Sequence, residues 1–344
     1  MSDGAGHQAG GPVPALLIVN PAGTRVRTGR TEEVTERLAD QLDLRVVETT
    51  GRGHATELAA GAPEAGVELV IVMGGDGTVN EVINGLPASM PLGLVGGGKT
   101  NVFARALGLP GEPMAAAARL LALIAGGTRR TISLGEASGR RFAFGAGLGL
   151  DGAIVREVER WRLTHRLHDD SMYLMAGLRT IATWDRSKPR LAVHLEDGRA
   201  PLRGFFAAAA NGDPYTYLGG RPMRLTPEAR FEGALEILVG QTMSPRLITR
   251  ALAGMLSSNP LLGYPGLPIL HDQRTCRLEA DVPLPFQVDG EYLGDRASVE
   301  LRSLPGALTV IAPAPSAVPG DDDLAGDGAE AAPAERSQVG GTDT

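Results

Sequence analysis

A glycine-rich segment at residues 74–78, with the sequence Gly-Gly-Asp-Gly-Thr, has the residue types that an anion-binding turn requires. Glycines let the backbone adopt left-handed conformations and turn several N–H groups toward a phosphate. A helix that starts at Val79 would add its positive N-terminal end. The alternative is a tight strand-to-helix turn in which Asp76 only accepts hydrogen bonds from nearby backbone amides. A short glycine motif taken alone favours that alternative.

Acidic residues stand next to glycines at two further places. Asp289 begins an Asp-Gly-Glu segment, and Asp151 follows the glycines of residues 147–149. On its own, the first segment favours the turn of a hairpin, because Asp-Gly is a common two-residue turn. Asp151 could cap a helix over residues 153–158, and this capping role can coexist with a role in the site.

The first part of the chain alternates short apolar runs with helical patterns, which is typical of a parallel α/β domain. The predicted strands cover residues 16–19, 44–47, 69–73 and 92–95, and the predicted helices begin at Thr31, at Val79 and after residue 98. At three places the carboxyl end of a strand runs into a glycine-bearing turn. In open α/β sheets, ligands bind at that edge.

Past about residue 130 the pattern changes to strand-like runs, which predicts a second, β-rich domain. The predicted strands cover residues 142–144, 191–195, 204–209, 236–239 and 308–311, with helices over 171–184 and 246–257. In the first of these helices, Met172, Met175, Leu178 and Ile181 share one face. The pattern favours burial of this face over contact with an acyl chain.

The fold class predicted from these patterns is α/β, with an N-terminal α/β nucleotide-binding domain and a C-terminal, β-rich, sandwich-like domain. The predicted boundaries are 1–13 for a disordered N-terminus, 14–132 for the α/β domain, 133–313 for the β-rich domain, and 314–344 for a disordered acidic tail. The last strand of the β-rich domain could return to the first domain. The tail lacks periodicity and is rich in Ala, Pro, Gly and Asp.

The charges argue against a nucleic-acid partner. The formal net charge is −7, and residues 316–344 hold seven acids against one arginine, so the rest of the chain is close to neutral. Nucleic-acid-binding proteins normally carry a strong basic excess. The single cysteine, Cys276, excludes an internal disulfide. With no apolar run of membrane-spanning length and no signal-peptide pattern, a cytoplasmic protein that contacts membranes transiently is predicted.

Six segments in order along the chain resemble the motifs of one enzyme family. Residues 74–82, Gly-Gly-Asp-Gly-Thr-Val-Asn-Glu-Val, are similar to the nucleotide-binding signature of the superfamily of diacylglycerol, sphingosine, ceramide and NAD kinases. The other five are Asn-Pro at 20–21 with the loop to residue 24, Gly-Lys-Thr-Asn-Val-Phe-Ala-Arg at 98–105, Gly-Leu-Gly-Leu-Asp-Gly at 147–152, Phe-Glu-Gly-Ala-Leu at 231–235, and Asp-Gly-Glu at 289–291. From about residue 14 to 313, their order and spacing resemble the diacylglycerol kinase and sphingosine kinase-like lipid kinase family.

This resemblance implies an ATP-dependent lipid kinase that uses Mg²⁺ and transfers the γ-phosphate to a hydroxyl of diacylglycerol or a long-chain base at a membrane surface. It also implies a tendency to form homodimers. Phosphoryl transfer needs a positioned triphosphate, a metal ion and a proton acceptor. The resemblance assigns Asp289 as general base and Glu291 as its assistant or as a metal ligand, with Asp76 and Asp151 near the metal ion. The ATP-binding residues that it implies are Asn20, Pro21, Gly23, Thr24, Gly74, Gly75, Asp76, Gly77, Thr78, Glu81, Gly98, Lys99, Thr100, Asn101 and Asp151.

Several residues depart from the family pattern. Gly96 stands in place of proline, Lys99 in place of a small hydroxyl residue, and Val102 in place of aspartate, while Gly23-Thr24 replaces Ser-Gly. Lys99 could direct its ammonium group toward a phosphate, although the spacing differs from a Walker A motif. It could equally be a solvated surface side chain. The sequence leaves both interpretations open.

Two alternative functions follow from the same residues. NAD kinases share the motif at 74–78, but this sequence has no counterpart of their second, Thr- and Ser-rich segment, and the motifs at 20–21 and 289–291 favour the lipid branch. The departures at 96, 99 and 102 also allow a nucleotide- or lipid-binding sensor without turnover.

A basic stretch at Arg156, Arg160, Arg162 and Arg166 could face lipid headgroups, although a solvated helix face is the commoner explanation.

Overall fold

The computed structural model describes residues 11–26, 30–164, 170–218, 220–256 and 263–315. The described residues up to Pro313 form one compact unit. The disordered segments predicted at the two ends lie almost entirely outside the described residues. No helix in the part of the chain that the structure describes is long and apolar enough to cross a membrane.

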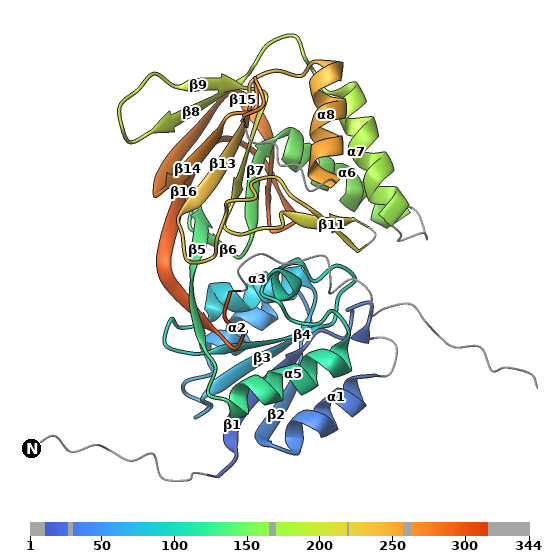
Figure 1. Ribbon diagram of the computed structural model, residues 1–344. Helices are drawn as coiled ribbons and strands as arrows, with labels where there is room; N and C mark the ends of the chain where they lie inside the picture. The colour runs from blue at the N-terminus through green and yellow to red at the C-terminus, as the bar shows by residue number, and fades with distance from the viewer. Residues whose placement is uncertain (1–10, 27–29, 165–169, 219, 257–262, 316–344) are drawn as a thin grey trace, which may run out of the picture. The chain divides into compact units, whose positions relative to one another are not determined.

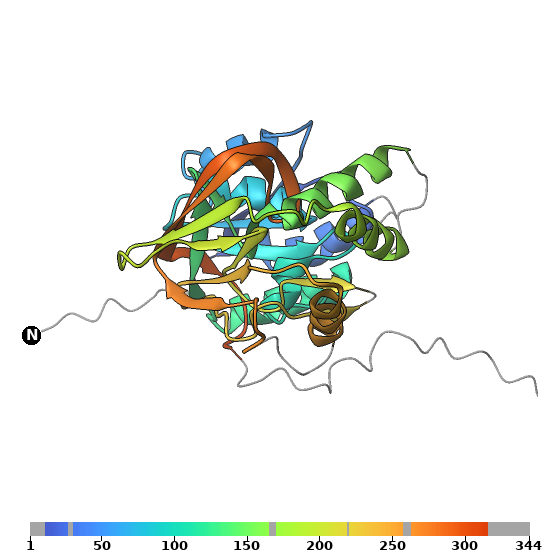
Figure 2. The same cartoon turned by 90° about the horizontal axis from the view of Figure 1, so that it is seen from above.

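The first part of the chain folds into a parallel sheet with helices on both faces. Its elements are β1 (Val13–Val19), α1 (Arg30–Ala39), β2 (Leu42–Glu48), α2 (His54–Ala60), β3 (Leu69–Gly74), α3 (Asp76–Gly85), β4 (Leu92–Gly96), α4 (Val102–Ala106) and α5 (Pro113–Ala125). The parallel strands run in the order β2, β1, β3, β4. Helices α1 and α5 pack on one face and α2 and α3 on the other (Figures 1 and 2). The predicted α/β domain is confirmed.

The central strands of this sheet are buried on both faces, which explains their continuous apolar sequences. Every residue of β3 is buried, as is every residue of β4. Leu17, Ile71 and Leu94 lie in one core cluster with Phe103 of α4. A buried sheet therefore supports the loops that follow β1, β3 and β4.

The second part of the chain is rich in strands, as predicted, and these strands pair mainly antiparallel. Its elements are β5 (Arg130–Ala137), β6 (Arg140–Phe142), β7 (Gly145–Gly149), α6 (Leu150–Thr164), α7 (Asp170–Thr183), β8 (Leu191–Leu195), β9 (Leu202–Gly204), β10 (Phe206–Ala210), β11 (Thr216–Leu218), β12 (Arg221–Met223), β13 (Leu235–Gly240), α8 (Pro245–Leu256), β14 (Ile269–Gln273), β15 (Thr275–Val288) and β16 (Glu291–Val310). Strands β14, β13, β10, β7, β15 and β16 lie in that order. Their inward side chains, including Leu148 and Phe286, form a second core cluster.

The 20-residue strand β16 connects this antiparallel region to the first sheet (Figure 1). It pairs with β15 across a hairpin and with β5 farther along. At its end, Val310 pairs in parallel with Leu92 of β4. The last strand thus reaches the parallel sheet, while the exact domain boundary between residues 132 and 133 stays a prediction.

The burial predicted for the apolar face of α7 is wrong for Met175 and Leu178, which are 58% and 46% exposed. Ile181 of the same face is partly buried and packs against a small core cluster. The helix also packs through Ala176, which is buried together with Val158 of α6. A small alanine lets the two helices approach closely. Met172 belongs to the same predicted face, but its side chain lies outside the described residues.

Candidate active site

Three loops follow the carboxyl ends of β1, β3 and β4, and hydrogen bonds tie them to each other. Asn20 donates from Nδ2 to Thr78 Oγ1 at 2.8 Å. The backbone N–H of Arg25 donates to the carbonyl of Gly97 at 3.0 Å, and the N–H of Gly97 donates to the carbonyl of Gly74 at 2.9 Å. The segments that the sequence singles out around residues 20–24, 74–78 and 96–101 therefore lie together at one edge of the sheet.

Close packing of the loops requires glycine at positions 97 and 98, whereas a Cβ atom on Gly77 would have no neighbour within 4 Å. The left-handed backbone predicted for residues 74–78 is wrong. Gly75 is extended, with φ −85° and ψ 179°, and none of the three glycines in this segment has a positive φ. A Cβ atom on Gly98 would lie 2.7 Å from the Cα atom of Gly75, and one on Gly97 would lie 2.9 Å from the nitrogen of Gly74. Because two loops pass within backbone contact, only glycine fits.

Helix α3 begins at Asp76, three residues earlier than predicted, with Gly75 as its N-cap. The first N–H groups of a helix lack partners within the helix and carry partial positive charge. The positive end of α3 therefore lies inside the glycine-rich loop. Such a helix end is suited to a phosphate.

The carboxylate of Asp76 ties this loop to helix α4. It accepts hydrogen bonds from the backbone N–H groups of Val102 at 3.0 Å and Phe103 at 3.1 Å, the first two residues of α4. Burial raises the pKa of Asp76 to about 6; these two donors oppose the shift, and the nearby Asp289 carboxylate adds to it. Both oxygens of Asp76 are thus engaged by the protein, as the alternative interpretation of the motif predicts.

Asn101 holds its own loop in shape, and its contact to ATP stays a prediction. It adopts a left-handed backbone, with φ 48°, and is 2% exposed. Its Oδ1 accepts from the N–H of Gly98 and its Nδ2 donates to the carbonyl of Gly98, both at 2.9 Å. A Cβ atom on Gly96 would lie 2.6 Å from Asn101 Nδ2, which accounts for glycine at a position where the family has proline.

The other residues with a predicted role in ATP binding lie on or beside these loops. Pro21, Thr24 and Lys99 are exposed, and Thr100 is partly buried. Glu81 is on α3, where its backbone carbonyl accepts a hydrogen bond of 2.8 Å from the Thr56 hydroxyl of α2. Their contacts to a nucleotide stay predictions.

Asp289 is both a hairpin turn residue and a buried carboxylate. With φ angles of 47° and 76°, Asp289 and Gly290 connect β15 to β16. Asp289 is 5% exposed and accepts four hydrogen bonds. Three come from the backbone N–H groups of residues 143–145, at 2.7, 3.0 and 3.0 Å, and one comes from Asn80 Nδ2 at 2.8 Å. Burial raises the pKa of Asp289, and these donors oppose the shift.

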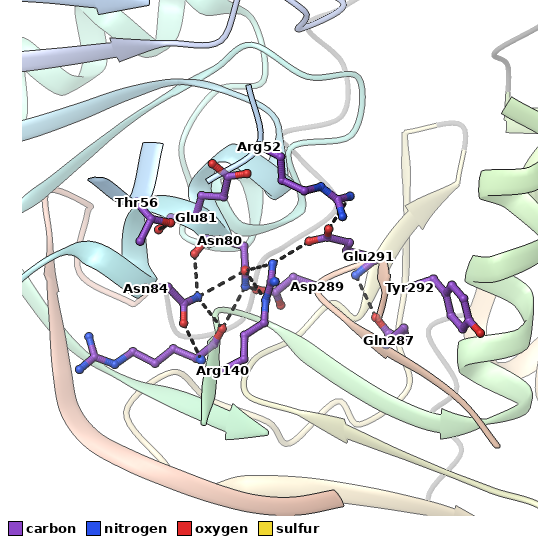
Figure 3. A network of polar contacts seen from close by, with 12 residues as sticks. Arg52, Thr56, Asn80, Glu81, Asn84, Arg140, Gln287, Asp289, Glu291 and Tyr292 are labelled. Carbon is purple, nitrogen blue, oxygen red and sulfur yellow. Dashed lines mark hydrogen bonds and ion pairs between the residues drawn. The ribbon is translucent and has the colours of Figure 1, made fainter. Parts of the chain in front are cut away.

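Asn80 stands one helical turn after Asp76 on α3, so the glycine-rich loop and the acidic turn lie close together. Around them, two arginines hold Glu291 (Figure 3). Arg140 Nη2 lies 2.6 Å from Glu291 Oε2, and Arg52 Nη2 lies 2.6 Å from Glu291 Oε1. Sequence reasoning missed both arginines, because no motif marks them and only the fold brings them to residue 291.

The third predicted carboxylate, Asp151, is in the first turn of α6, which begins at Leu150. Its Oδ2 accepts a hydrogen bond from the Tyr215 hydroxyl at 2.8 Å and from Gln287 Nε2 at 2.6 Å. Burial raises the pKa of Asp151, and the pKa of Tyr215 is well above its ordinary value for the same reason. Gln287, two residues before Asp289, is a further site residue that the sequence analysis did not single out.

The described residues contain no group of three or more His, Cys, Asp or Glu side chains that could hold a metal ion alone. Both oxygens of Asp76 accept from N–H groups, whereas Asp151 uses only Oδ2 for its two hydrogen bonds. In kinases, Mg²⁺ takes few protein ligands and relies on phosphate oxygens and water. The site fits a Mg²⁺ ion that arrives with a nucleotide, and the metal role of Asp76 and Asp151 stays a prediction.

The basic stretch on α6 is partly neutralised by acidic partners. Arg156 lies 3.4 Å from Asp295, and Arg160 lies 3.4 Å from Glu157. Arg166 lies outside the described residues. The paired arginines agree with the interpretation of a solvated helix face.

Comparison with known proteins shows the family. Residues 14–137 match the model of the diacylglycerol kinase catalytic domain, and residues 146–312 match that of the YegS C-terminal NAD kinase beta sandwich-like domain. The chain is 29% identical to a protein of Chromohalobacter salexigens named "Probable lipid kinase YegS-like", over 86% of this chain and 90% of that protein. It is 30% identical to a protein of the same name from Pseudomonas aeruginosa, over 83% and 91%.

A diacylglycerol kinase crystal structure from Bacillus anthracis has the same fold, with a TM-score of 0.63, 22% identity, and coverage of 87% of this chain and 97% of that one. The two-part architecture thus agrees with the sequence matches. The chain belongs to the family of YegS-like lipid kinases, which carry a diacylglycerol kinase catalytic domain.

Proposed function

We propose that this protein transfers the γ-phosphate of ATP to a hydroxyl of a lipid, either a diacylglycerol or a long-chain base, in lipid metabolism. The observation that carries the proposal is the contact between Asn80 and Asp289. It brings the acidic turn within one helical turn of the glycine-rich loop. A phosphate donor and a hydroxyl acceptor could therefore meet between them. Membership in a lipid kinase family supports the lipid as acceptor.

The loops would bind the triphosphate through backbone N–H groups and the positive end of α3. Mg²⁺ bound between the phosphates would neutralise negative charge while the γ-phosphoryl group leaves ADP and bonds to the lipid oxygen. Asp289 would accept the proton of the lipid hydroxyl. Four N–H donors orient this carboxylate, three from the backbone of residues 143–145 and one from the side chain of Asn80. The lipid hydroxyl would approach as a further donor and share an acceptor site with one of the backbone N–H groups.

A membrane surface is the proposed source of the lipid. Leu174, Met175 and Leu178 on α7 are 44%, 58% and 46% exposed, and Arg179, which follows them directly and is itself exposed, lies 3.4 Å from Glu157. Exposed apolar side chains next to a cation are typical of helices that lie in a membrane interface. Replacing these three with serine should weaken sedimentation with anionic vesicles while leaving ATP binding unchanged. Unchanged sedimentation would remove α7 from the proposal.

The proposed activity can be tested with purified protein, labelled Mg-ATP and a total lipid extract, with the phosphorylated product identified by mass. The same protein is offered NAD in parallel. A phosphorylated lipid is expected; phosphorylated NAD alone would identify an NAD kinase. ATP or lipid binding without acceptor-dependent ADP release would indicate a sensor. Light scattering after gel filtration would test the predicted homodimer.

A further inference from the structure

The side chain of Asn80 can face Asp289 with either end of its amide group. Only the NH₂ end suits a carboxylate, because the oxygen of the amide would be repelled by it. The other groups around Asn80 must therefore favour the orientation in which the NH₂ group faces Asp289. In this structure the NH₂ end lies 2.8 Å from Asp289 Oδ2.

Arg140 makes the shortest contacts to the oxygen end of this amide, where Asn84 Nδ2 also donates at 3.3 Å; the NH₂ end donates to the Arg141 carbonyl at 3.0 Å as well. Its guanidinium group can only donate hydrogen bonds. Nε and Nη2 of Arg140 both donate to Asn80 Oδ1, at 3.0 and 2.7 Å. With its oxygen held by two N–H groups of one arginine, Asn80 has only its NH₂ end left for Asp289.

Arg140 is itself fixed from two sides. It is the first residue of β6, where it pairs with Ala137 of β5. Its Nη2 also contacts Glu291 Oε2 at 2.6 Å, just past the hairpin turn. Arg140 therefore bridges α3 and the acidic turn with one planar group, and Figure 3 shows the continuous path from Glu291 through Arg140 and Asn80 to Asp289.

We propose that Arg140 is a positioning residue for phosphoryl transfer: it holds Asn80 in the orientation that fixes the carboxylate of Asp289. The kinetic part of this inference rests on the proposed function, whereas the geometric part does not. Without the guanidinium group, Asn80 Oδ1 would keep only the 3.3 Å contact from Asn84 Nδ2, and the amide would be held less firmly. The hydrogen bond from Asn80 to Asp289 would weaken, while the three backbone donors of residues 143–145 would remain.

Four variants separate positioning from a general contribution to stability. Arg140→Lys keeps a positive charge for Glu291, but a single ammonium group cannot reproduce the planar contacts to Asn80. Arg140→Lys, Arg140→Ala and Asn80→Ala should each lower kcat by about 10-fold or more, with the KM for ATP changed by less than about 3-fold. The double variant Arg140→Ala with Asn80→Ala should be no slower than the slower single variant, because both changes break one path.

Arg141→Lys provides a matched control. The side chain of Arg141 contacts the carbonyls of Ile83 and Leu86 at the far end of α3, at 3.3 and 3.4 Å. It makes the same kind of contact to the same helix without touching Asp289, so kcat should stay at the wild-type value. An unchanged kcat in both Arg140 variants, next to an active wild type, would overturn the proposal and leave the proposed function intact.

A crystal structure of the Arg140→Ala variant tests the geometry without any turnover. We expect the Asn80 Nδ2 to Asp289 Oδ2 hydrogen bond to be lost or the amide to be rotated. An unchanged contact would overturn the proposal whatever the activity. If the wild type phosphorylates no acceptor at all, the proposed function fails, and this structure still decides whether Arg140 positions Asn80.

Discussion

Gln287 joins Asp151 to the turn that carries Asp289. Its Nε2 donates to Asp151 Oδ2 at 2.6 Å, and its Oε1 accepts from the N–H of Gly290 at 2.9 Å. One side chain therefore couples the first turn of α6 to the acidic hairpin. Because Tyr215 donates to the same oxygen of Asp151, the position of that carboxylate depends on two neutral donors.

Tyr215→Phe should lower kcat by about 10-fold, because it removes one hydrogen bond to a buried carboxylate while leaving the ring in place. Steady-state kinetics and a thermal melt measure the effect on rate and on stability. Tyr292→Phe is the control, since the Tyr292 hydroxyl donates to the exposed Asp295 at 2.7 Å. A lower melting temperature with an unchanged kcat would show that Asp151 only supports the fold.

Asp289→Ala should abolish transfer and leave ATP binding largely intact, because the nucleotide loops do not depend on its carboxylate. The three backbone N–H groups of residues 143–145 would lose their acceptor. We expect a loss of about 2–4 kcal/mol in the free energy of unfolding. Urea unfolding, calorimetric titration with ATP and an activity assay measure the three effects. Turnover at the wild-type rate would disprove the assignment of Asp289 as base.

Gly98→Ala should raise the KM for ATP by about 10-fold or more, because the new methyl group would push the two phosphate loops apart at Gly75. Gly61→Ala is a suitable control. Gly61 has φ −81°, and a Cβ atom there would have no neighbour closer than 3.5 Å. Equal KM values for both variants would contradict the role of loop contact in ATP binding.

Asp76→Asn should change how stability depends on pH. The pKa of Asp76 is raised from 3.8 to about 6, so the folded state holds this proton more tightly than the unfolded state. Its contribution to stability is present below pH 3.8 and is lost as the pH rises through about 6. The free energy of unfolding of the wild type, relative to Asp76→Asn, should therefore fall by up to about 3 kcal/mol between these values.

Urea unfolding at pH 4, 5, 6 and 7 tests this dependence. Asp43→Asn is the control, because Asp43 is exposed on β2 and its replacement should leave the slope unchanged. A difference that grows with pH would mean that the folded protein stabilises the ionised form of Asp76.

Local patterns predicted the parallel sheet, its glycine turns and the hairpin at residue 289, because these features are encoded by short apolar runs and turn residues. Helix α5 was not predicted, although Glu112 caps its N-terminus and Pro113 is its first residue, which are recognisable start signals. The length of β16 was also missed, since a proline and two glycines interrupt its alternation.

The contacts of the candidate site depend on tertiary packing and were less predictable. The motifs located Asp76, Asp151 and Asp289, but not the donors that surround them. Arg140 and Asn80 are 60 positions apart in the sequence, and only the packing of β6 against α3 brings them into contact. The burial of Met175 and Leu178 on α7 was predicted wrongly, because a helical pattern does not show which face of the helix meets a neighbour.

Strand β16 begins at Glu291, beside the acidic turn, and ends at Val310, beside Leu92 of the sheet that supports the glycine loops. Because Leu92 is the first residue of β4, this link lies at the end of the strand opposite the glycine loops. The main-chain pairing of β16 therefore joins the acidic turn to the sheet at a distance from the loops, and the side-chain contact between Asn80 and Asp289 brings the turn close to them.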